Sequence, residues 1–204
     1  MLLISNLKLP RNFYERPDVV QIARDLLGKK LFSSVDNQEV SGLITEVEAY
    51  RGYDDKACHA CNGKRTNRTE VMFGQGGHAY VYLCYGIHHL LNIVTNVTGK
   101  ADAVLIRAVK PLTGVTHMHS RRNHPHSAKA LTCGPGVLSQ AFGVTKKQHN
   151  GKDLLSDELW IEDQPLISDN DVVATTRVGV DYAEEDALKP WRFYVKTNKW
   201  ISKK

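Results

Sequence analysis

The clearest helical pattern near the start of the chain is the segment from Pro17 to Leu27. Apolar residues recur there every three or four positions, and Gly28 follows them. Such spacing predicts an amphipathic helix that packs one face on a core and ends at the glycine. The residues on the apolar face are Val20, Ala23, Leu26 and Leu27.

Four later segments carry the branched and aromatic residues that favour strands. They are Val40 to Tyr50, Ala79 to Tyr85, His88 to Thr95 and Ala103 to Val109. The second and third are joined through Tyr85-Gly86-Ile87, so we expect a hairpin there. Successive residues of the first strand point to opposite faces of the sheet. One face then carries Glu46, Glu48 and Tyr50, and the other carries Thr45, Val47 and Ala49.

Two further helices are predicted, from Leu112 to Arg122 and from Val137 to Phe142. Gly134-Pro135-Gly136 precedes the second, and its amides either form a plain turn or offer N–H groups to a phosphate. The polar stretch from Lys146 to Asp153 and the pieces near Gln164 and Asn170 are predicted to be surface loops.

Length and composition favour one domain that contains both helices and strands. A chain of 204 residues with 42% hydrophobic content can bury a sizeable core, and no internal repeat divides it. We therefore expect a single compact domain over residues 1–204.

Charge and cysteine content indicate a cytosolic protein with an anionic partner. The excess of 27 Lys and Arg over 22 Asp and Glu gives a net charge of +5, with basic groups clustered around 64–68 and 100–129. The first 17 residues lack the apolar run of a signal peptide, and no segment reaches the ~18 apolar residues of a membrane span. The four cysteines lack the spacing of a disulfide framework.

The segment from Cys58 to Cys61 is the one candidate metal site. It places two thiols and the imidazole of His59 within four residues. The other cysteines are isolated, however. A zinc deaminase would need an H-x-E motif with a later P-C-x-x-C, and the sequence contains neither motif. We therefore expect no metal and no other cofactor.

Glu48 is the strongest candidate acid or base. It shares a strand face with Glu46 and Tyr50, and Arg107 ends an apolar strand that we place in the same sheet. Two carboxylates on a sheet either meet water and basic groups at an edge or face a site. The nearby aromatic and basic residues favour a pocket for a flat ring carried on a polyanion.

These residues form a set of motifs that resembles the alkyladenine (3-methyladenine) DNA glycosylases of the mammalian and Bacillus type. The motifs are spread over nearly the whole chain. They are F-Y-x-x-P (13–17), A-x-x-L-L-G (23–28), E-x-E-A-Y (46–50), D-x-A-x-H (55–59), R-T-x-R-x-x-x-M-F (65–73), Y-V-Y-x-x-Y-G (80–86), Asn92, L-I-R-A (105–108), G-P-G-x-L (134–138), R-V-G-V (177–180) and K-P-x-R-F-Y-V (189–195).

The resemblance implies an α+β fold with a curved mixed, mainly antiparallel sheet, flanked by helices, and a protruding β-hairpin that inserts into DNA. It implies excision of alkylated or deaminated purines from double-stranded DNA after the base has been flipped out. Glu48 would activate a water molecule, and Arg107 and the main-chain carbonyl of Val178 would place that water. An arginine beside Glu48 should also keep the carboxylate ionised. Since no lysine or amino-terminal amine matches a family nucleophile, no strand cleavage is expected.

The resemblance also assigns the residues that would hold the DNA. Tyr50 would stack on one side of the flipped base and His59 with Tyr82 on the other, while Asn92 would crowd the amino group of a normal guanine. Tyr85 would wedge into the minor groove. The remaining expected DNA contacts are Gly86, Ile87, Thr66, Arg68, Met72, Gly134 and Gly136.

Four positions depart from the family pattern. Tyr53 and Asn67 stand where proline is usual, and Asn62 and Glu184 stand where glycine is usual. None is a catalytic position, so they bear on affinity and lesion preference.

Two other functions fit parts of the sequence. A basic scaffold distantly similar to the carboxy-terminal domain of a formyltransferase could bind nucleic acid without catalysis. A metal hydrolase could use the segment from Cys58 to Cys61. The intact set of Glu48, Tyr50, His59 and Arg107 favours the glycosylase, which we expect to be a monomer. The lack of a long basic extension before the first motif favours a bacterial form, active in the cytoplasm at the nucleoid.

Overall fold

The protein is described here from a computed structural model, which covers residues 7–125 and 127–203. Residues 1–6, 126 and 204 lie outside the described residues. The signal-peptide prediction depends in part on residues 1–6. Six helices are present in the described part: α1 (Arg11–Tyr14), α2 (Val19–Leu26), α3 (Val115–Arg121), α4 (Ala128–Thr132), α5 (Pro135–Ala141) and α6 (Lys146–His149).

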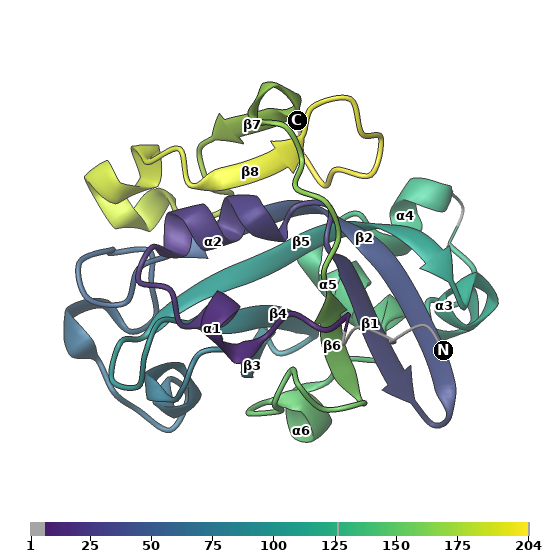
Figure 1. The fold of residues 1–204 in the computed structure, drawn as a ribbon, viewed down its shortest axis with the longest axis horizontal. Coiled ribbons are helices and arrows are strands. Elements are labelled where there is room, and N and C mark those ends of the chain that lie inside the picture. The colour runs from purple at the N-terminus through teal and green to yellow at the C-terminus, as the bar shows by residue number, and fades with distance from the viewer. Residues whose placement is uncertain (1–6, 126, 204) are drawn as a thin grey trace, which may run out of the picture.

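An eight-stranded sheet forms the centre of the fold (Figure 1). Its strands are β1 (Lys30–Val35), β2 (Gln38–Tyr50), β3 (Ala79–Cys84), β4 (His88–Thr95), β5 (Asp102–Thr113), β6 (Leu159–Glu162), β7 (Val172–Thr175) and β8 (Arg192–Val195). The strand order is β3-β4-β5-β2-β1-β6, and β8 pairs with both β2 and β7. Short 3₁₀ segments occupy Cys61–Gly63, Glu70–Phe73, Asp169–Asp171 and Asp181–Leu188.

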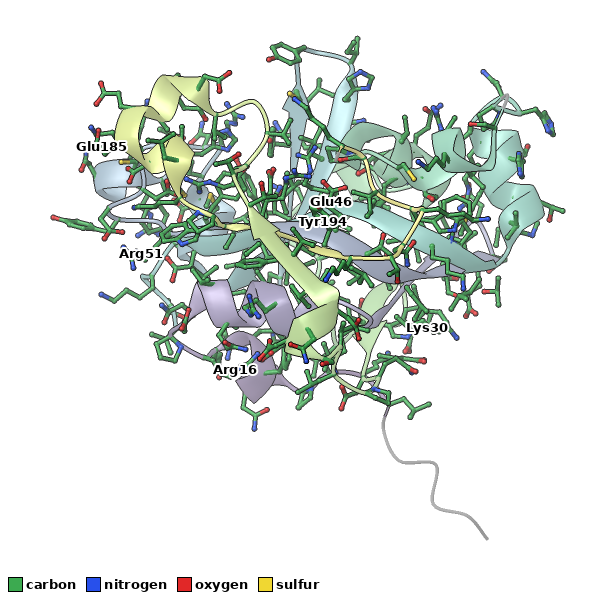
Figure 2. The ribbon with its side chains drawn as sticks, turned by 90° about the horizontal axis from the view of Figure 1, so that it is seen from above. Arg16, Lys30, Glu46, Arg51, Glu185 and Tyr194 are labelled. Carbon is green, nitrogen blue, oxygen red and sulfur yellow. The ribbon has the colours of Figure 1, made fainter. Side chains whose placement is uncertain are left out.

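The predicted α+β class is confirmed, with one difference in the sheet. Every pairing among the described strands is antiparallel, so the expected parallel part of a mixed sheet is not found there. The β3–β4 hairpin predicted from Tyr85-Gly86-Ile87 is present. Figure 2 shows this hairpin rising clear of the rest of the molecule.

Helices cover both faces of the sheet. Helix α2 packs on β2 and β5, and α5 packs on β4 and β5. Figure 1 shows α2 in front of the sheet and α5 behind it. Helix α2 begins where the Asp18 carboxylate accepts hydrogen bonds from the amides of Val20 and Gln21, which explains its start two residues after Pro17.

Several predicted boundaries are wrong for identifiable reasons. Strand β5 continues to Thr113 because Lys110, Pro111 and Thr113 still face partners on β2, so Arg107 lies in its middle and α3 begins only at Val115. The predicted loop from Lys146 to Asp153 contains α6, which the Thr145 side chain caps through the amide of Gln148.

The register between β2 and β5 shifts twice near the middle of the sheet. Ile44 faces Val109, Glu46 faces Ala108 and Val47 faces Ile106. Thr45 and Arg107 are therefore left without a residue opposite them. The shift places Ile44 with Val47 in the hydrophobic core. The prediction that Thr45 shares the face of Val47 is wrong, because Thr45 instead donates to the Trp200 carbonyl at 2.6 Å.

None of the helices in the described ranges is both long and apolar enough to cross a lipid bilayer.

Candidate active site

Glu48 lies on β2 between β5 and β8, and its side chain is fully buried. Its Oε2 accepts a hydrogen bond from the Tyr50 hydroxyl at 2.7 Å. Its Oε1 accepts one from the Val178 amide at 2.7 Å and lies 3.2 Å from Nη1 of Arg107. Burial of a carboxylate is costly unless it is paired and hydrogen-bonded, and these three contacts meet that demand.

Arg107 links Glu48 to the second carboxylate of the motif. Its Nε donates to Oε1 of Glu46 at 3.0 Å, and the guanidinium is almost completely buried. Burial, the largest influence, lowers the pKa of Arg107, but the charges of Glu48 and Glu46 outweigh it and leave the pKa above its ordinary value. Arg107 therefore stays a cation beside Glu48.

Tyr50 is held as a neutral hydrogen-bond donor. Burial, followed by the charge of Glu48, raises the pKa of its hydroxyl well above the ordinary value. The Arg177 guanidinium lies 4.9 Å from the centre of the Tyr50 ring and is itself paired with Asp55, one bond of 2.8 Å joining Nη2 and Oδ1. Both partners of this ion pair have fully buried side chains, so they fix the wall on which Tyr50 rests.

A cavity of about 270 Å³ opens beside this acid. It contains the predicted ring-stacking residues together with Asn92, Arg107 and Val178. Its lining is Tyr50, Ala57, Cys58, His59, Met72, Tyr80, Tyr82, Cys84, Tyr85, Leu90, Asn92, Ala103, Leu105, Arg107, Pro135, Val178, Gly179, Val180 and Tyr182. Glu48 lies behind Tyr50, Arg107 and Val178 and is not itself part of the lining.

His59 is fixed as a neutral imidazole in one tautomer. Nη2 of Arg68 lies 2.9 Å from Nε2, and because arginine can only donate, Nε2 must carry the lone pair. Nδ1 then holds the proton and donates to the Tyr80 hydroxyl at 3.0 Å. Burial, and after it the charge of Arg68, lowers the pKa of His59 to about 4.

The rings of His59 and Tyr82 are nearly perpendicular, with an interplanar angle of 84° and centroids 4.7 Å apart. Two perpendicular rings cannot both lie flat on one base, so one of them presents its edge. The structure brings Tyr50, His59 and Tyr82 to one cavity, but the rings of His59 and Tyr82 stand at nearly right angles and do not form one flat stacking surface.

Asn92 is buried in β4 with its amide orientation set by the strand. Its Nδ2 donates to the Tyr80 carbonyl at 3.1 Å and more weakly to the Leu90 carbonyl at 3.4 Å. The side chain lines the cavity with the side-chain oxygen as its remaining polar atom.

Tyr85 stands at the tip of the hairpin with 92% of its surface exposed, so ordinary surface packing does not account for it. The Ile87 amide closes the turn onto the Cys84 carbonyl at 3.1 Å, and Ile87 is exposed as well. Tyr85 and Gly86 have φ angles of 50° and 75°, the left-handed pair typical of a tight hairpin turn. For tyrosine this backbone is strained by roughly 1–2 kcal/mol.

The other residues expected at DNA have different surroundings. Thr66 is exposed, and Arg68 is exposed but turned onto His59, with its guanidinium 4.8 Å from the Tyr82 ring centre. Met72 is buried beneath the cavity and presents almost no outer surface. The Gly134 amide donates to the Arg107 carbonyl at 3.0 Å and is not free for a phosphate, whereas Gly136 lies in the first turn of α5 against His88.

Two of the four departures occupy glycine-like backbone. Asn62 has φ 57° and ψ 28°, which asparagine tolerates, and Glu184 has φ 54° and ψ −126°, a region that is strained for any residue except glycine. Tyr53 and Asn67 are exposed in turns.

The segment from Cys58 to Cys61 does not gather ligands. Burial raises the pKa of the Cys58 thiol to about 12, and both ring nitrogens of His59 are already engaged. Within the described ranges, no three His, Cys, Asp or Glu side chains come together in a way that could hold a metal ion.

A larger cleft of about 370 Å³ lies elsewhere, beside Arg51 and Asp102. Its acidic groups already have partners within this chain: Asp54 pairs with Arg51 at the surface, and Asp102 accepts from the Gly52 amide at 2.8 Å. The smaller cavity, with a carboxylate behind aromatic walls, is therefore the candidate active site.

Sequence reasoning left several contributors without a role. Asp55, Tyr80 and Arg177 belong to the recognised motifs, but only their tertiary contacts reveal what they support. The alternation of Tyr80 and Tyr82 on a predicted strand put both rings on one face, so it was a usable signal that Tyr80, like Tyr82, lies beside His59.

Comparison with known proteins shows the family of this chain. The model of the methylpurine-DNA glycosylase family matches residues 12–199. A protein of Bacillus cereus (strain G9842) is 46% identical over 97% of this chain and all of its own length. Proteins of Alkaliphilus oremlandii and Methanocella arvoryzae are each 47% identical, over 97% and 96% of this chain and 100% and 96% of their own lengths.

All three relatives are provisionally named 3-methyladenine DNA glycosylases. The family model matches nearly the full chain. The chain therefore belongs to the methylpurine-DNA glycosylase family.

Proposed function

We propose that this protein is a monofunctional DNA glycosylase that starts base excision repair. It flips an alkylated or deaminated purine out of duplex DNA and hydrolyses the N-glycosidic bond. The substrate class comprises 3-methyladenine, 7-methylguanine, hypoxanthine and ethenoadenine. The observation that carries the proposal is the buried Glu48 carboxylate, held by Tyr50, Arg107 and Val178 directly behind an aromatic cavity.

Base flipping follows from the shape of the site. A purine inside the helical stack cannot reach a recessed cavity, so it must rotate out of the duplex. The exposed Tyr85 at the tip of the hairpin suits the gap that the base leaves, because apolar and aromatic wedges fill opened base steps. The strained backbone at Tyr85 also fits a residue retained for contact with a partner.

The chemical step uses water and the Glu48 carboxylate. Glu48 accepts a proton from the water as its oxygen attacks C1′ of the sugar. The C1′–N bond breaks, and its electron pair leaves with the base. The sugar passes through an oxocarbenium-like state that the Glu48 charge stabilises, and the products are an abasic sugar and a free base. Arg107 orients the carboxylate, and the Val178 backbone holds its Oε1.

The charge of the base decides how easily it leaves. 3-Methyladenine and 7-methylguanine are cations in the nucleoside, so they leave as neutral bases without a proton donor. Hypoxanthine and ethenoadenine are neutral in the nucleoside and leave as anions, and the proton that Glu48 takes from the water returns through solvent to the departing base. A neutral His59 does not repel a cationic base, whereas a protonated His59 would. Aromatic faces attract cationic rings further. Undamaged purines also lack this charge, and Asn92, which lines the cavity, would exclude a normal guanine by crowding its exocyclic amino group.

The partner is double-stranded DNA that contains a damaged purine, and the protein is proposed to act as a monomer without a metal ion. Because water is the nucleophile, no covalent enzyme–DNA adduct forms. Sodium borohydride should therefore trap nothing, and a trapped adduct would show amine catalysis instead.

The test is base release from duplex oligonucleotides that carry one hypoxanthine or ethenoadenine, and from methylated DNA. Alkali-revealed breaks at the lesion report excision by the wild type. Glu48→Gln keeps the shape of the side chain and the Tyr50 contact but removes the carboxylate that accepts the proton from water. This variant should therefore bind the lesion duplex and release no nucleobase. Binding without release by the wild type as well would favour a binding module that does not catalyse.

A further inference from the structure

Glu46 is fully buried, lies two residues before Glu48 on β2, and does not line the cavity. Figure 2 places it in the middle of the molecule beside Tyr194 of β8, its partner in the sheet. Its Oε1 accepts from Nε of Arg107 at 3.0 Å and from Nη1 of Arg192 at 2.9 Å. A second buried acid so close to Glu48 requires a reason.

Ser202 completes the environment of Glu46. Its amide donates to Oε2 of Glu46 at 2.6 Å, and its hydroxyl donates to Oε1 at 2.9 Å. The same hydroxyl oxygen accepts from Nη2 of Arg107 at 3.1 Å. One serine therefore contacts both Glu46 and the arginine that reaches Glu48.

The segment from Trp200 to Lys203 is tied to the sheet on either side of Ser202. The Trp200 carbonyl accepts from the Thr45 hydroxyl at 2.6 Å, and the Lys203 carbonyl accepts from Nη1 of Arg192 at 2.7 Å. Thr45 is the residue of β2 that the register shift leaves unpaired, so the shift creates the attachment point for this segment.

Each nitrogen of Arg107 thus has a different partner. Nε meets Glu46, Nη1 meets Glu48 and Nη2 meets Ser202. A planar guanidinium bound at all three nitrogens has no freedom to rotate. Without Glu46 and Ser202, the Nη1–Glu48 contact would be the only polar contact that sets its orientation.

We propose that Ser202 and Glu46 are positioning residues for base excision: they fix Arg107 so that Nη1 holds the Glu48 carboxylate in its reactive orientation. Glu46 also shares the charge of Arg107. The inference rests on the proposed function, since it concerns the rate of that hydrolysis.

The first test compares single-turnover excision of hypoxanthine from a duplex by the wild type, Ser202→Ala and Ser202→Thr. Ser202→Ala should lower the maximal rate roughly tenfold, the loss expected when one hydrogen bond to a charged group is removed. Its affinity for the lesion duplex should stay within about twofold, because Ser202 does not itself line the cavity. Ser202→Thr restores the hydroxyl and should recover most of the rate.

A matched control separates positioning from loss of stability. Ser33 on β1 is buried and, like Ser202, its hydroxyl donates one hydrogen bond, here to the Phe142 carbonyl at 2.8 Å. Ser33→Ala should lower the melting temperature without changing the excision rate. An equal fall in rate for Ser33→Ala and Ser202→Ala would overturn the inference, and so would an unchanged rate for Ser202→Ala.

Glu46→Gln provides a second readout, because it removes the charge that faces Arg107 and keeps most of the shape of the side chain. Nε of Arg107 then meets a neutral amide in place of a carboxylate. The single-turnover rate should fall at least as far as in Ser202→Ala, while the affinity for the lesion duplex stays within about twofold.

An excision rate for Glu46→Gln equal to that of the wild type would contradict the shared-charge role. A wild type that releases no base from any lesion would instead overturn the proposed function, and this inference with it. A normal wild type with unaffected Ser202→Ala and Glu46→Gln variants would leave the proposed function standing and remove only the positioning role.

Discussion

The Tyr50 hydroxyl donates to Oε2 of Glu48 at 2.7 Å, so the ring expected to stack on the damaged base also holds the acid. Binding and chemistry are joined in one side chain. A base stacked on Tyr50 would contact the residue that orients Glu48. The Arg177 guanidinium packs on the Tyr50 ring and limits movement of that ring.

Removal of only the Tyr50 hydroxyl should slow excision and spare binding. Tyr50→Phe keeps the ring but leaves Oε2 of Glu48 without its donor, which costs about 1.5–3 kcal/mol for a hydrogen bond to a charged group. We expect the single-turnover rate to fall at least tenfold, with affinity for a hypoxanthine duplex nearly unchanged. Tyr50→Ala, which also removes the ring, should weaken binding. Equal affinity losses in both variants would assign the hydroxyl to binding instead.

The strands that surround the site follow patterns of branched and aromatic residues and were predictable. The alternation that puts Glu46, Glu48 and Tyr50 on one face was predictable too. The double register shift at Thr45 and Arg107 was not, because it depends on pairing with a distant strand. Strands of four residues such as β6, β7 and β8 are too short for periodicity to distinguish them from loops.

The site itself was predictable as a set of residues but not as a network. Motifs brought Glu48, Tyr50, His59, Tyr82 and Asn92 together on the strength of resemblance. The turn of Arg68 onto His59, the engaged amide of Gly134 and the contact of Ser202 with Arg107 arise from tertiary packing. Local sequence carries no signal for contacts between positions so far apart.

Tyr85 should matter for DNA and not for folding. It is exposed and strained, so Tyr85→Gly should leave the free energy of unfolding unchanged or raise it by up to about 1 kcal/mol. Affinity for lesion duplex should fall roughly tenfold, since an inserted ring is worth ~1–3 kcal/mol of stacking. Tyr85→Ala is the matched control, because it removes the ring and keeps the backbone strain. Fluorescence anisotropy and thermal melting measure the two effects, and a stability loss without a binding loss would contradict the wedge role.

Glu184 should be a site where glycine stabilises the protein. Its backbone, at φ 54° and ψ −126°, is strained by roughly 1–3 kcal/mol for a non-glycine residue. Glu184→Gly relieves this strain and loses an exposed ion pair with Lys56. Glu184→Ala loses the same ion pair but keeps the strain, so the glycine variant should unfold at higher urea concentration than the alanine variant. If the alanine variant is the more stable of the two, the strain is absent in solution.

His59 should make stability depend on pH below neutrality. The pKa of His59 is about 4 in the folded protein against 6.5 ordinarily, because burial and Arg68 disfavour its charge. Between pH 4 and pH 6.5 the histidine of the unfolded chain binds a proton and His59 of the folded protein does not. The part of the free energy of unfolding that depends on His59 is therefore complete above pH 6.5 and is lost as the pH falls toward 4. At pH 5 the loss amounts to about 2 kcal/mol, since a tenfold change in proton affinity is worth about 1.4 kcal/mol. Urea unfolding of the wild type and His59→Asn at pH 7 and pH 5 measures this loss. The titration of carboxylates is common to both proteins, so the difference between them reports His59. The wild type should lose about 2 kcal/mol more than His59→Asn, and equal losses would mean that the hydrogen bond from Arg68 to Nε2 of His59 does not keep the imidazole neutral in solution.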